Sequence, residues 1–391
     1  MAEIKPAVET FAKIKVVGVG GGGNSAINRM IDAGVKGVDF LAVNTDVQAL
    51  HYNKANNKIH IGKSITRGLG AGMSPELGKQ SAEESQNDIR DALKDADMVF
   101  VTCGLGGGTG TGATPIVAEI ARDLGALTVA VVTKPFAFEG VQRKNIAERG
   151  LNELSDKVDT IITIPNDKLL QVIDKKTSLL DAFSVVDDVL QQGVAGIAEL
   201  ITVPGLINVD FADVKAVMSN AGSALMGIGQ ASGENKAIEA AKGAINSPLL
   251  EMSIDGARGV LFTVTGGTNM GMNEVNEAAK IITASADDEA KIIFGTVIDA
   301  KLKDEIKITV VATGFDYKVD SAREPAAANE RPYTPNTFIN NKDKKENISN
   351  KKSKRHSLKA AQSEPAAKKS IAQDDEDDEL GIPAFIRKKM E

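Results

Sequence analysis

Short apolar segments alternate with helical patterns from residue 14 to residue 315, and the alternation stops beyond Tyr317. In the first half, most of the apolar segments are β-rich and separated by helical patterns. They lie at residues 13–19, 38–43, 97–104, 127–133 and 158–164. Strands that alternate with helices predict a parallel sheet with helices on both faces. We therefore expect an α/β domain at residues 14–177, after an N-terminal extension at residues 1–13.

Residues 178–202 have the pattern of one long helix, in which apolar residues recur at steps of three and four. These residues are Leu179, Leu180, Phe183, Val186, Leu190, Val194, Ile197 and Ile201. After this central helix, strands are expected at 224–230, 259–265, 291–298 and 306–313, and helices at 235–245 and 272–286. The last two strands have no helix between them. A second, smaller α/β domain with a mixed sheet is thus predicted at residues 203–317.

Residues 318–373 are rich in Pro, Ala, Asn, Lys and Ser and have few large apolar side chains, which predicts a disordered linker. As a flexible coil of about 56 residues it would have a root-mean-square reach of about 40 Å. An acidic run at residues 374–379 follows, and then apolar residues return. Ile382, Phe385 and Ile386 would form one stripe on a helix, beside the basic Arg387. Residues 374–391 are expected to be a partner-binding peptide, the alternative being a solvated terminus whose basic residues balance the acidic run.

The composition of the 391 residues narrows the possible classes of function. The net charge of -7 argues against a general nucleic-acid binder, which needs a surplus of Lys and Arg. Cys103 is the only cysteine, so no internal disulfide can form and a reducing compartment, the cytoplasm, is expected. No segment approaches the ~18 apolar residues of a membrane span, so any membrane contact is expected to be indirect.

The first candidate for chemistry is a glycine-rich turn between a strand and a helix. Its sequence, from Gly18 to Ser25, is GVGGGGNS. Such a turn lets the backbone approach an anion and directs free N–H groups and the positive end of a helix toward it. Gly18, Gly20 and Gly23 also match G-x-G-x-x-G, so an NAD-dependent Rossmann oxidoreductase is an alternative, supported by polar residues near Asn44 and Asp46. A turn that serves only tight packing is a third interpretation.

A second loop of the same kind follows the strand at 97–104, with the sequence LGGGTGTG from Leu105 to Gly112. A dinucleotide fold needs one such loop, whereas a triphosphate held without a Walker lysine would use several. The sequence also contains Gly62-Lys63-Ser64, but Asn57 stands where a Walker loop has its first glycine. Asn-Lys-x-Asp, a guanine-recognition motif, is absent from the sequence as well. Two phosphate-binding loops that converge on one ligand are the simplest interpretation.

These loops resemble the tubulin/FtsZ family of GTPases, in particular its bacterial cell-division members. Residues 106–112 resemble the signature loop of the family, and residues 20–24 its first nucleotide loop. The resemblance extends through residues 70–76, 133–136 and 208–213 to the final peptide, in the order of the family, and covers residues 14–317. Ser25 and Ala137 depart from it, because members often carry Asn or another polar residue there.

The resemblance implies a tubulin-like fold, with a Rossmann-type GTPase domain joined by the long central helix to the smaller domain. It also implies that GTP or GDP is bound, with Mg²⁺ held mainly through the phosphates. The implied nucleotide contacts are Gly20, Gly21, Gly22, Gly23, Asn24, Ser25, Ala71, Gly72, Gly104, Gly106, Gly107, Gly108, Thr109, Gly110, Thr133, Pro135, Glu139, Arg143, Asn166, Phe183 and Asp187.

Four of these contacts have an alternative interpretation from spacing alone. Phe183 and Asp187 share a helix face, where the carboxylate could accept two hydrogen bonds from guanine while the ring packs on the base. By periodicity, Phe183 would be core and Asp187 solvated. Glu139 and Arg143 would form an ordinary helix salt bridge, whereas the resemblance makes them ribose and phosphate contacts. Asn166 is implied to contact the base or the ribose.

The candidate catalytic residues are Asn208, Asp210 and Asp213, immediately before and within a helical run. On sequence alone, Asp210 could be the N-cap of that helix, with Asp213 stabilised by the helix dipole. The resemblance implies instead that these residues meet the γ-phosphate of the neighbouring subunit, so that GTP hydrolysis depends on assembly. A scaffold that binds nucleotide without hydrolysis would be favoured by loss of Asp210 or Asp213, and both are present.

The resemblance also implies partners and a location. The chain itself is the first partner, in head-to-tail filaments that form the division ring at mid-cell, on the inner face of the membrane. Membrane-tethering division proteins such as FtsA, ZipA, SepF or EzrA are the second. They would bind the final peptide through Ile382, Pro383, Phe385, Ile386 and Arg387.

Overall fold

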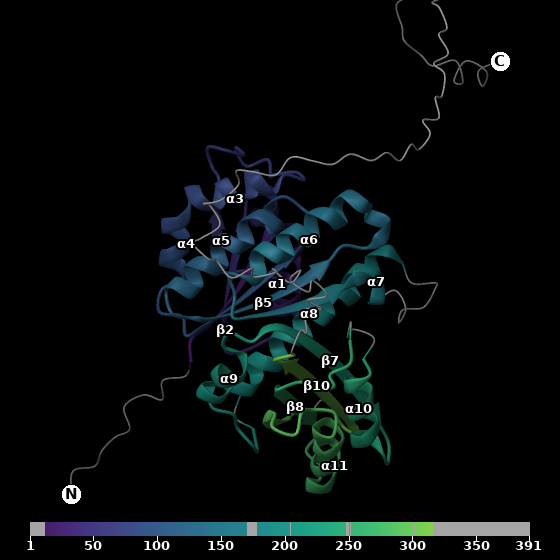
Figure 1. The fold of residues 1–391 in the computed structure, drawn as a ribbon. Coiled ribbons are helices and arrows are strands. Elements are labelled where there is room, and N and C mark those ends of the chain that lie inside the picture. Colours follow the sequence, from purple (N-terminus) through teal and green to yellow (C-terminus); the bar gives the residue numbers. More distant parts are fainter. Residues whose placement is uncertain are drawn as a thin grey trace, which may run out of the picture. The chain divides into compact units, whose positions relative to one another are not determined.

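The computed structural model describes residues 12–169, 178–203, 205–247, 250, 252–299 and 302–315. The described residues all belong to one compact unit (Figure 1). The predicted linker at 318–373 and the predicted peptide at 374–391 lie outside the described residues, as does most of the predicted extension at 1–13.

The sheet of the first half is parallel, as predicted, and contains six strands. They lie in the order β3-β2-β1-β4-β5-β6. Their bounds are β1 Ile14–Val19, β2 Val38–Asn44, β3 Asn57–His60, β4 Met98–Gly104, β5 Leu127–Lys134 and β6 Thr160–Pro165. The edge strand β3 was not predicted.

Helices cover both faces of this sheet, and successive strand residues point to opposite faces. Val16 of β1 packs in one cluster with α1 and the central helix, whereas Val17 packs in another with α3, α4, α5 and α6. The helices of the first half are α1 Gly20–Asp32, α2 Val47–Tyr52, α3 Pro75–Glu84, α4 Gln86–Leu93, α5 Thr109–Asp123, the short η1 Ala137–Glu139, α6 Val141–Ser155 and α7 Asn166–Leu169.

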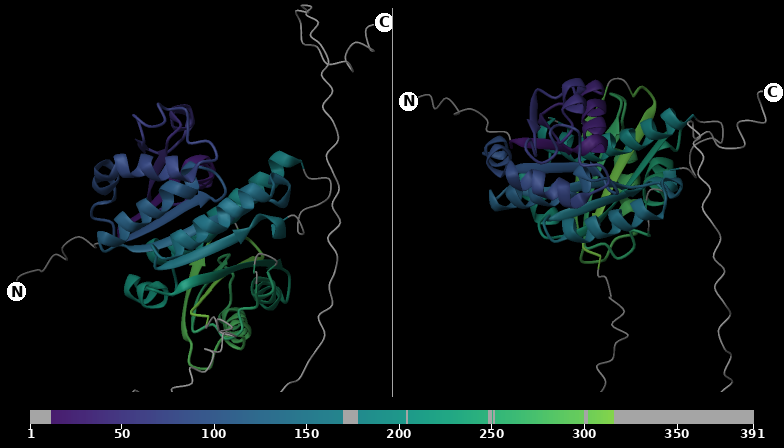
Figure 2. Two further views of the ribbon diagram at one scale, coloured as in Figure 1. Left: turned by 45° about the horizontal axis from the view of Figure 1, so that its top comes forward. Right: turned by 90° about the horizontal axis from the view of Figure 1, so that it is seen from above.

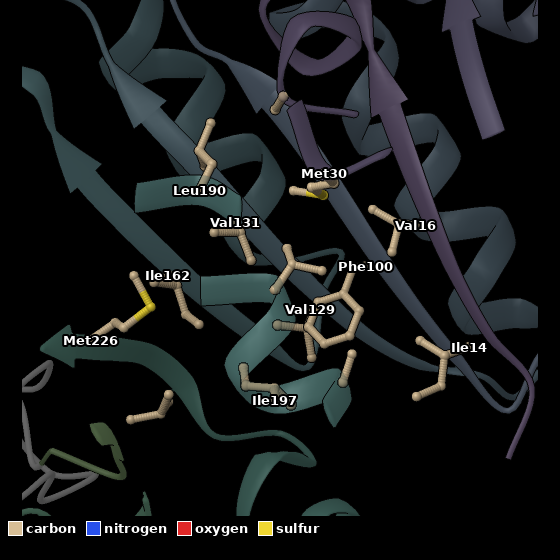
Figure 3. Close-up of a cluster of buried hydrophobic side chains, with 14 of the residues drawn as sticks. Ile14, Val16, Met30, Phe100, Val129, Val131, Ile162, Leu190, Ile197 and Met226 are labelled. Carbon is tan, nitrogen blue, oxygen red and sulfur yellow. The ribbon is translucent and has the colours of Figure 1, made fainter. Parts of the chain in front are cut away.

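The predicted central helix is α8, Leu179–Thr202. It begins at Ser178, whose Oγ accepts a hydrogen bond from the N–H of Asp181 at 3.2 Å, a typical N-cap. Leu190 and Ile197 of α8 pack with Phe100, Val129 and Val131 of the sheet (Figure 3). The same cluster contains Leu261 and Val311 of the second half, so α8 is buried between the two halves of the unit. The predicted spine is confirmed.

The second half contains a mixed sheet, as predicted. Strand β10 is antiparallel to both β7 and β8, whereas β9 is parallel to β8. Helices α10 and α11 cover the face that is turned away from α8, and Figure 2 shows this arrangement in two further views. The bounds are α9 Phe211–Met218, β7 Gly222–Ser232, α10 Lys236–Ile245, β8 Gly259–Gly266, α11 Met272–Thr283, β9 Lys291–Ile298 and β10 Glu305–Thr313.

Strand β7 joins the two halves because it changes partner along its length. Residues 222–224 pair with β6 in parallel, and residues 225–232 pair with β10 in the antiparallel sense. The result is one sheet of ten strands in the order β3-β2-β1-β4-β5-β6-β7-β10-β8-β9. The hydrogen bonds between strands therefore continue from the first half into the second half, although the sequence predicts a boundary between two domains at the central helix.

Candidate nucleotide-binding site

The first glycine loop is the first turn of α1, which begins at Gly20 directly after β1. Gly20 has a φ of 72°, a conformation that favours glycine. A side chain at Gly18 would lie 2.5 Å from the carbonyl oxygen of Gly23, so the strand and the helix turn are packed closely there. The first N–H groups of a helix have no partner within it and are available to an anion.

The second loop connects β4 to α5 in the same way. Gly106 has a φ of 102°, and its N–H donates to the Thr111 hydroxyl at 2.9 Å. The hydroxyl of Thr109, the first residue of α5, lies 2.6 Å from that of Thr45. These hydrogen bonds fix the start of α5, so that a second helix N-terminus is held near the first.

A third glycine segment packs against the second loop, backbone against backbone. The N–H of Gly108 donates to the carbonyl oxygen of Gly72 at 2.9 Å. A Cβ at Gly108 would lie 2.4 Å from that same oxygen, and one at Gly20 would lie 2.8 Å from the nitrogen of Gly110. By contrast, no heavy atom would lie within 4 Å of a Cβ at Gly21 or at Gly107. Some of these glycines thus allow close packing, whereas others border open space.

The three segments surround a cleft of about 330 Å³, which most of the predicted nucleotide contacts line. These are Gly21, Gly22, Gly72, Gly104, Gly107, Gly108, Thr109, Gly110, Thr133, Pro135, Glu139, Arg143, Asn166, Phe183 and Asp187. Among the described residues, the other predicted contacts, which are Gly20, Gly23, Asn24, Ser25, Ala71 and Gly106, lie beside the cleft lining rather than in it.

The sequence interpretation missed four residues of the lining: Val19, Leu105, Val186 and Leu190. Val186 and Leu190 lie three and seven positions after Phe183, on the helix face that Phe183 and Asp187 share. Helical periodicity could therefore have found these two.

Glu139 and Arg143 form an ion pair and also line the cleft. An Nη of Arg143 lies 2.6 Å from Oε2 of Glu139, while Oε1 of Glu139 accepts from the N–H of Phe136 at 3.0 Å. Both carboxylate oxygens of Glu139 are thus engaged, and the Arg143 guanidinium has further donors to offer. The salt bridge that the spacing predicts is therefore present, and the role of the pair as ribose and phosphate contacts stays a prediction.

Asp187 projects from α8 into the cleft beside Phe183. The pKa of Asp187 is raised to about 6, mainly by burial; the charge of Arg29 acts to lower it and that of Asp188 to raise it. Phe183 is 41% exposed and makes an edge contact with Phe136, at 5.4 Å between ring centroids. Its ring is therefore not plain core, and part of it faces the open cleft.

Two buried asparagines have polar side-chain atoms without a partner. Both side-chain atoms of Asn24 and the Oδ1 of Asn166 make no hydrogen bond among the described residues. An unpaired buried polar group costs free energy, so its presence indicates a ligand or a water that satisfies it. Asn166 lines the cleft, so its unpaired oxygen, together with the open space at Gly21 and Gly107, fits a bound polar ligand such as a nucleotide.

The acidic segment with Asn208, Asp210 and Asp213 is not part of this cleft. It follows the other end of α8 and is held against β9, where the Ile207 N–H donates to the Thr296 hydroxyl at 3.0 Å. Oδ1 of Asn208 accepts from the N–H of Gly205 at 2.6 Å. Asp210 occupies the N-cap position of α9, but its side chain makes no capping hydrogen bond, and both aspartates are exposed.

Asn44 and Asp46, which supported the dinucleotide alternative, act as local caps. Oδ1 of Asn44 accepts from the N–H of Thr45 at 2.9 Å, and Oδ1 of Asp46 accepts from that of Ala49 at the start of α2.

Burial raises the pKa of the Cys103 thiol to about 12, so this cysteine stays protonated. The described residues include no group of three or more His, Cys, Asp or Glu side chains that could hold a metal ion. None of the described helices could span a membrane.

The parallel sheet, the glycine turns that open α1 and α5, and the long helix between two halves define a nucleotide-binding protein of tubulin-like architecture. Residues 13–174 match the GTPase domain of the Tubulin/FtsZ family, and residues 222–316 match the C-terminal domain of the FtsZ family. The chain belongs to the FtsZ family and is a GTPase, and the NAD-dependent oxidoreductase is not favoured.

Solved structures agree with this assignment. The chain is similar to an empty FtsZ dimer from M. jannaschii, with 50% identity and a TM-score of 0.76 over 78% of this chain and 89% of that one. It is also similar in fold to a GTPγS-bound protofilament of CetZ2 from Haloferax volcanii, with 21% identity and a TM-score of 0.66 over 77% of this chain and 92% of that one.

Proposed function

We propose that this GTPase assembles head to tail, and that the acidic segment of one subunit completes the hydrolytic site on the nucleotide of the next. The observation that carries the proposal is the separation of two incomplete sites. The helix rises by about 22 Å between Asp187 and Thr202, and the acidic segment follows beyond that. We infer that the cleft holds the nucleotide, while Asp210 and Asp213 are exposed and lie outside the cleft lining.

In this proposal the cleft binds GTP mainly through backbone groups. The N-termini of α1 and α5 hold the phosphates, with Gly20 to Ser25, Ala71 and Gly72, and Gly104 to Gly110 around them. Glu139, Arg143, Thr133 and Pro135 lie along the nucleotide, and Asn166 hydrogen-bonds the base or the ribose. Asp187 accepts two hydrogen bonds from guanine, whose edge carries two donors, and Phe183 packs on the base.

The chemistry requires that a water be oriented and that charge on the phosphates be neutralised. Asp210 and Asp213 of the neighbouring subunit would orient the water, and Asn208 would fix the segment that carries them. Mg²⁺ would be held mainly by the phosphate oxygens, where it supplies charge neutralisation.

The GTPase rate per subunit, measured over a dilution series, tests the proposal. If the site is shared, the specific rate rises with protein concentration above an assembly threshold. The matched control is the same series with a slowly hydrolysed GTP analogue followed by sedimentation, which locates the threshold independently. A specific rate that stays constant across the threshold would contradict a shared site.

Assembly and cell division are part of the same proposal. The M. jannaschii structure is a dimer of a 50% identical FtsZ, and the CetZ2 structure is a protofilament of a protein with the same fold. We expect the filaments to form a ring at the mid-cell division site, in the cytoplasm on the inner face of the membrane. Membrane contact would then be indirect.

The proposed tether is the peptide at residues 374–391, which lies outside the described residues. Its apolar Ile382, Pro383, Phe385 and Ile386, with Arg387, would bind FtsA, ZipA, SepF or EzrA. A chain truncated after Glu379 should keep its GTPase rate and its assembly but lose binding to the tether. Unchanged binding of the truncated chain to the tether of its host would count against this part of the proposal.

A further inference from the structure

An ion pair connects the helix that carries the phosphate loop to the helix that carries Asp187. Nε of Arg29, in the third turn of α1, lies 3.3 Å from Oδ1 of Asp188 on α8. Asp188 is the next residue after Asp187, which lines the nucleotide cleft. The side chains of Arg29 and Asp188 are 36% and 51% exposed, so water reaches this pair.

Several charged groups surround Asp187. Arg29 on α1 is paired with Asp188, the residue that follows Asp187 on α8, and its positive charge favours the ionised form of Asp187. Glu139 and Arg143 line the same cleft and are paired with each other. Helix α7, which also packs against α8, carries Asp167 and Lys168. Arg29 is thus the cation, and Asp188 the anion, that act most strongly on the charge of Asp187.

The charge state of Asp187 matters for guanine recognition. An ionised carboxylate accepts hydrogen bonds at both oxygens, whereas a protonated carboxyl presents one O–H donor in place of an acceptor. Guanine offers two N–H donors. If Asp187 is protonated, its O–H points a donor at one of these N–H groups, and that hydrogen bond is lost. Because burial raises the pKa of Asp187 to about 6, small changes in the surrounding charge alter its ionised fraction close to neutral pH.

We propose that Arg29 is a positioning residue for guanine recognition: by pairing with Asp188, next to Asp187 on α8, it places a positive charge near the Asp187 carboxylate and keeps it charged and ready to accept from the base. The inference rests on the proposed contact between Asp187 and guanine. It couples the phosphate-binding helix to the base-binding helix through one guanidinium.

The expected effect is modest, because a half-exposed ion pair is weakened by water and salt. We expect the removal of either charge to move the midpoint of the pH dependence by about half a pH unit. This corresponds to about a threefold change in affinity on the acidic side of the midpoint. The direction of the shift is more informative than its size.

The experiment measures the Kd of methylanthraniloyl-GDP from pH 5 to pH 8, at a protein concentration that does not support assembly. Arg29→Met should move the midpoint to higher pH, because it removes the cation and leaves Asp188 unpaired. Asp188→Asn should move the midpoint to lower pH, because it removes the like charge and frees Arg29 to face Asp187. Arg29→Lys, which keeps the charge, should stay close to the wild type.

Opposite shifts are not expected from a merely structural role of the pair. If Arg29→Met and Asp188→Asn move the midpoint in the same direction, or leave it in place, the inference is overturned. The same holds if Arg29→Lys behaves like Arg29→Met.

Asp187→Ala separates this inference from the proposed base contact. The phosphates of GDP also titrate near pH 6, and Asp187→Ala reports that contribution alone. If Asp187→Ala leaves both the affinity and its pH dependence unchanged, the base contact itself is wrong. If Asp187→Ala weakens binding and flattens the profile while the Arg29 and Asp188 variants do not shift it, only the role of Arg29 fails.

Discussion

At one end of α8 lies a cleft that three glycine-rich segments and several side chains line, whereas the segment beyond the other end carries exposed carboxylates. The cleft beside α1 and α5 is built from turns whose positions are fixed by short hydrogen bonds, such as that from Gly108 to Gly72. The acidic segment is fixed through its backbone and Asn208, while Asp210 and Asp213 extend into solvent. In the proposed function, the first end holds the phosphates of one subunit and the second acts on those of the next.

The contrast is tested most strongly at Asp213. Asp213→Ala should lower the GTPase rate per subunit by on the order of a hundredfold or more, as removal of a group that orients the attacking water does. Its affinity for GDP should stay within about twofold of the wild type, because Asp213 lies outside the cleft of its own subunit. The measurements are phosphate release and equilibrium binding of a fluorescent GDP.

Two controls accompany this variant. Asp91→Ala removes an exposed aspartate from α4 and should change neither quantity. A mixture of Asp213→Ala with the wild type should hydrolyse GTP more slowly than dilution predicts, because mutant subunits occupy interfaces. If Asp213 acts only through the helix dipole of α9, the variant instead loses about 0.3–1 kcal/mol of stability and keeps its rate.

Substitutions of two neighbouring glycines in the second loop test whether close backbone contacts define the cleft. Gly108→Ala should cost about 1–3 kcal/mol of stability, because its Cβ would lie 2.4 Å from the Gly72 oxygen. Gly107→Ala should stay within about 0.5 kcal/mol of the wild type, because nothing lies within 4 Å of its Cβ. It should nevertheless weaken GDP binding, since the methyl group enters the cleft.

Urea unfolding without nucleotide gives the stabilities, and fluorescent GDP gives the affinities. The two variants serve as controls for each other, since they add the same methyl group at adjacent positions. Equal losses of stability would mean that the loop adapts and that its backbone contacts do not define the cleft.

The smallest effect is expected at Asp187, where stability and binding should change in opposite directions. Its folded-state pKa of about 6 lies above its ordinary value of 3.8, so the folded protein binds the proton more tightly than the unfolded chain. The ionised carboxylate therefore destabilises the empty fold above pH 6 and has no such effect below about pH 4.

Asp187→Asn should accordingly stabilise the nucleotide-free protein at pH 7.5 by on the order of 1 kcal/mol, after allowance for the partial exposure of the side chain. The gain should fall toward zero as the pH is lowered to about 4. The same variant should bind GDP more weakly. Urea unfolding at several pH values measures the gain, and a gain that does not depend on pH would assign it to packing rather than to charge.

The parts of the fold that local pattern determines were predictable. The observed bounds of the strands at 14–19 and 98–104 and of the helix at 179–202 differ from the predicted bounds by one residue at most. Strand β3 was missed because its four residues, Asn57–His60, are largely polar and form only an edge. Strand β7 begins earlier than predicted, at Gly222, because pairing with β6 and not propensity places those residues in a strand.

In the site, too, local features could be predicted from the sequence and contacts between distant segments could not. The glycine loops could be recognised because each is contiguous in the sequence and lies between a strand and a helix. The contact of Gly72 with Gly108 and the pairing of Arg29 with Asp188 could not, since each joins segments that only the fold brings together. The missing capping bond of Asp210 could not be predicted either, because it depends on a side-chain rotamer.

The change of partner along β7 has a mechanical consequence. Only three residue pairs, beginning with Thr160 and Gly222, connect the parallel ladder to the rest of the sheet, whereas eight pairs hold β7 to β10. Around that narrow connection α8 packs on both halves mainly through apolar side chains, and such packing has no preferred direction. A hydrogen-bonded ladder strongly resists bending. Apolar packing resists the separation of the two packed surfaces more than it resists a small rotation of one against the other. Under a pulling or twisting load the unit would therefore yield first by rotation about β7, with its core still closed.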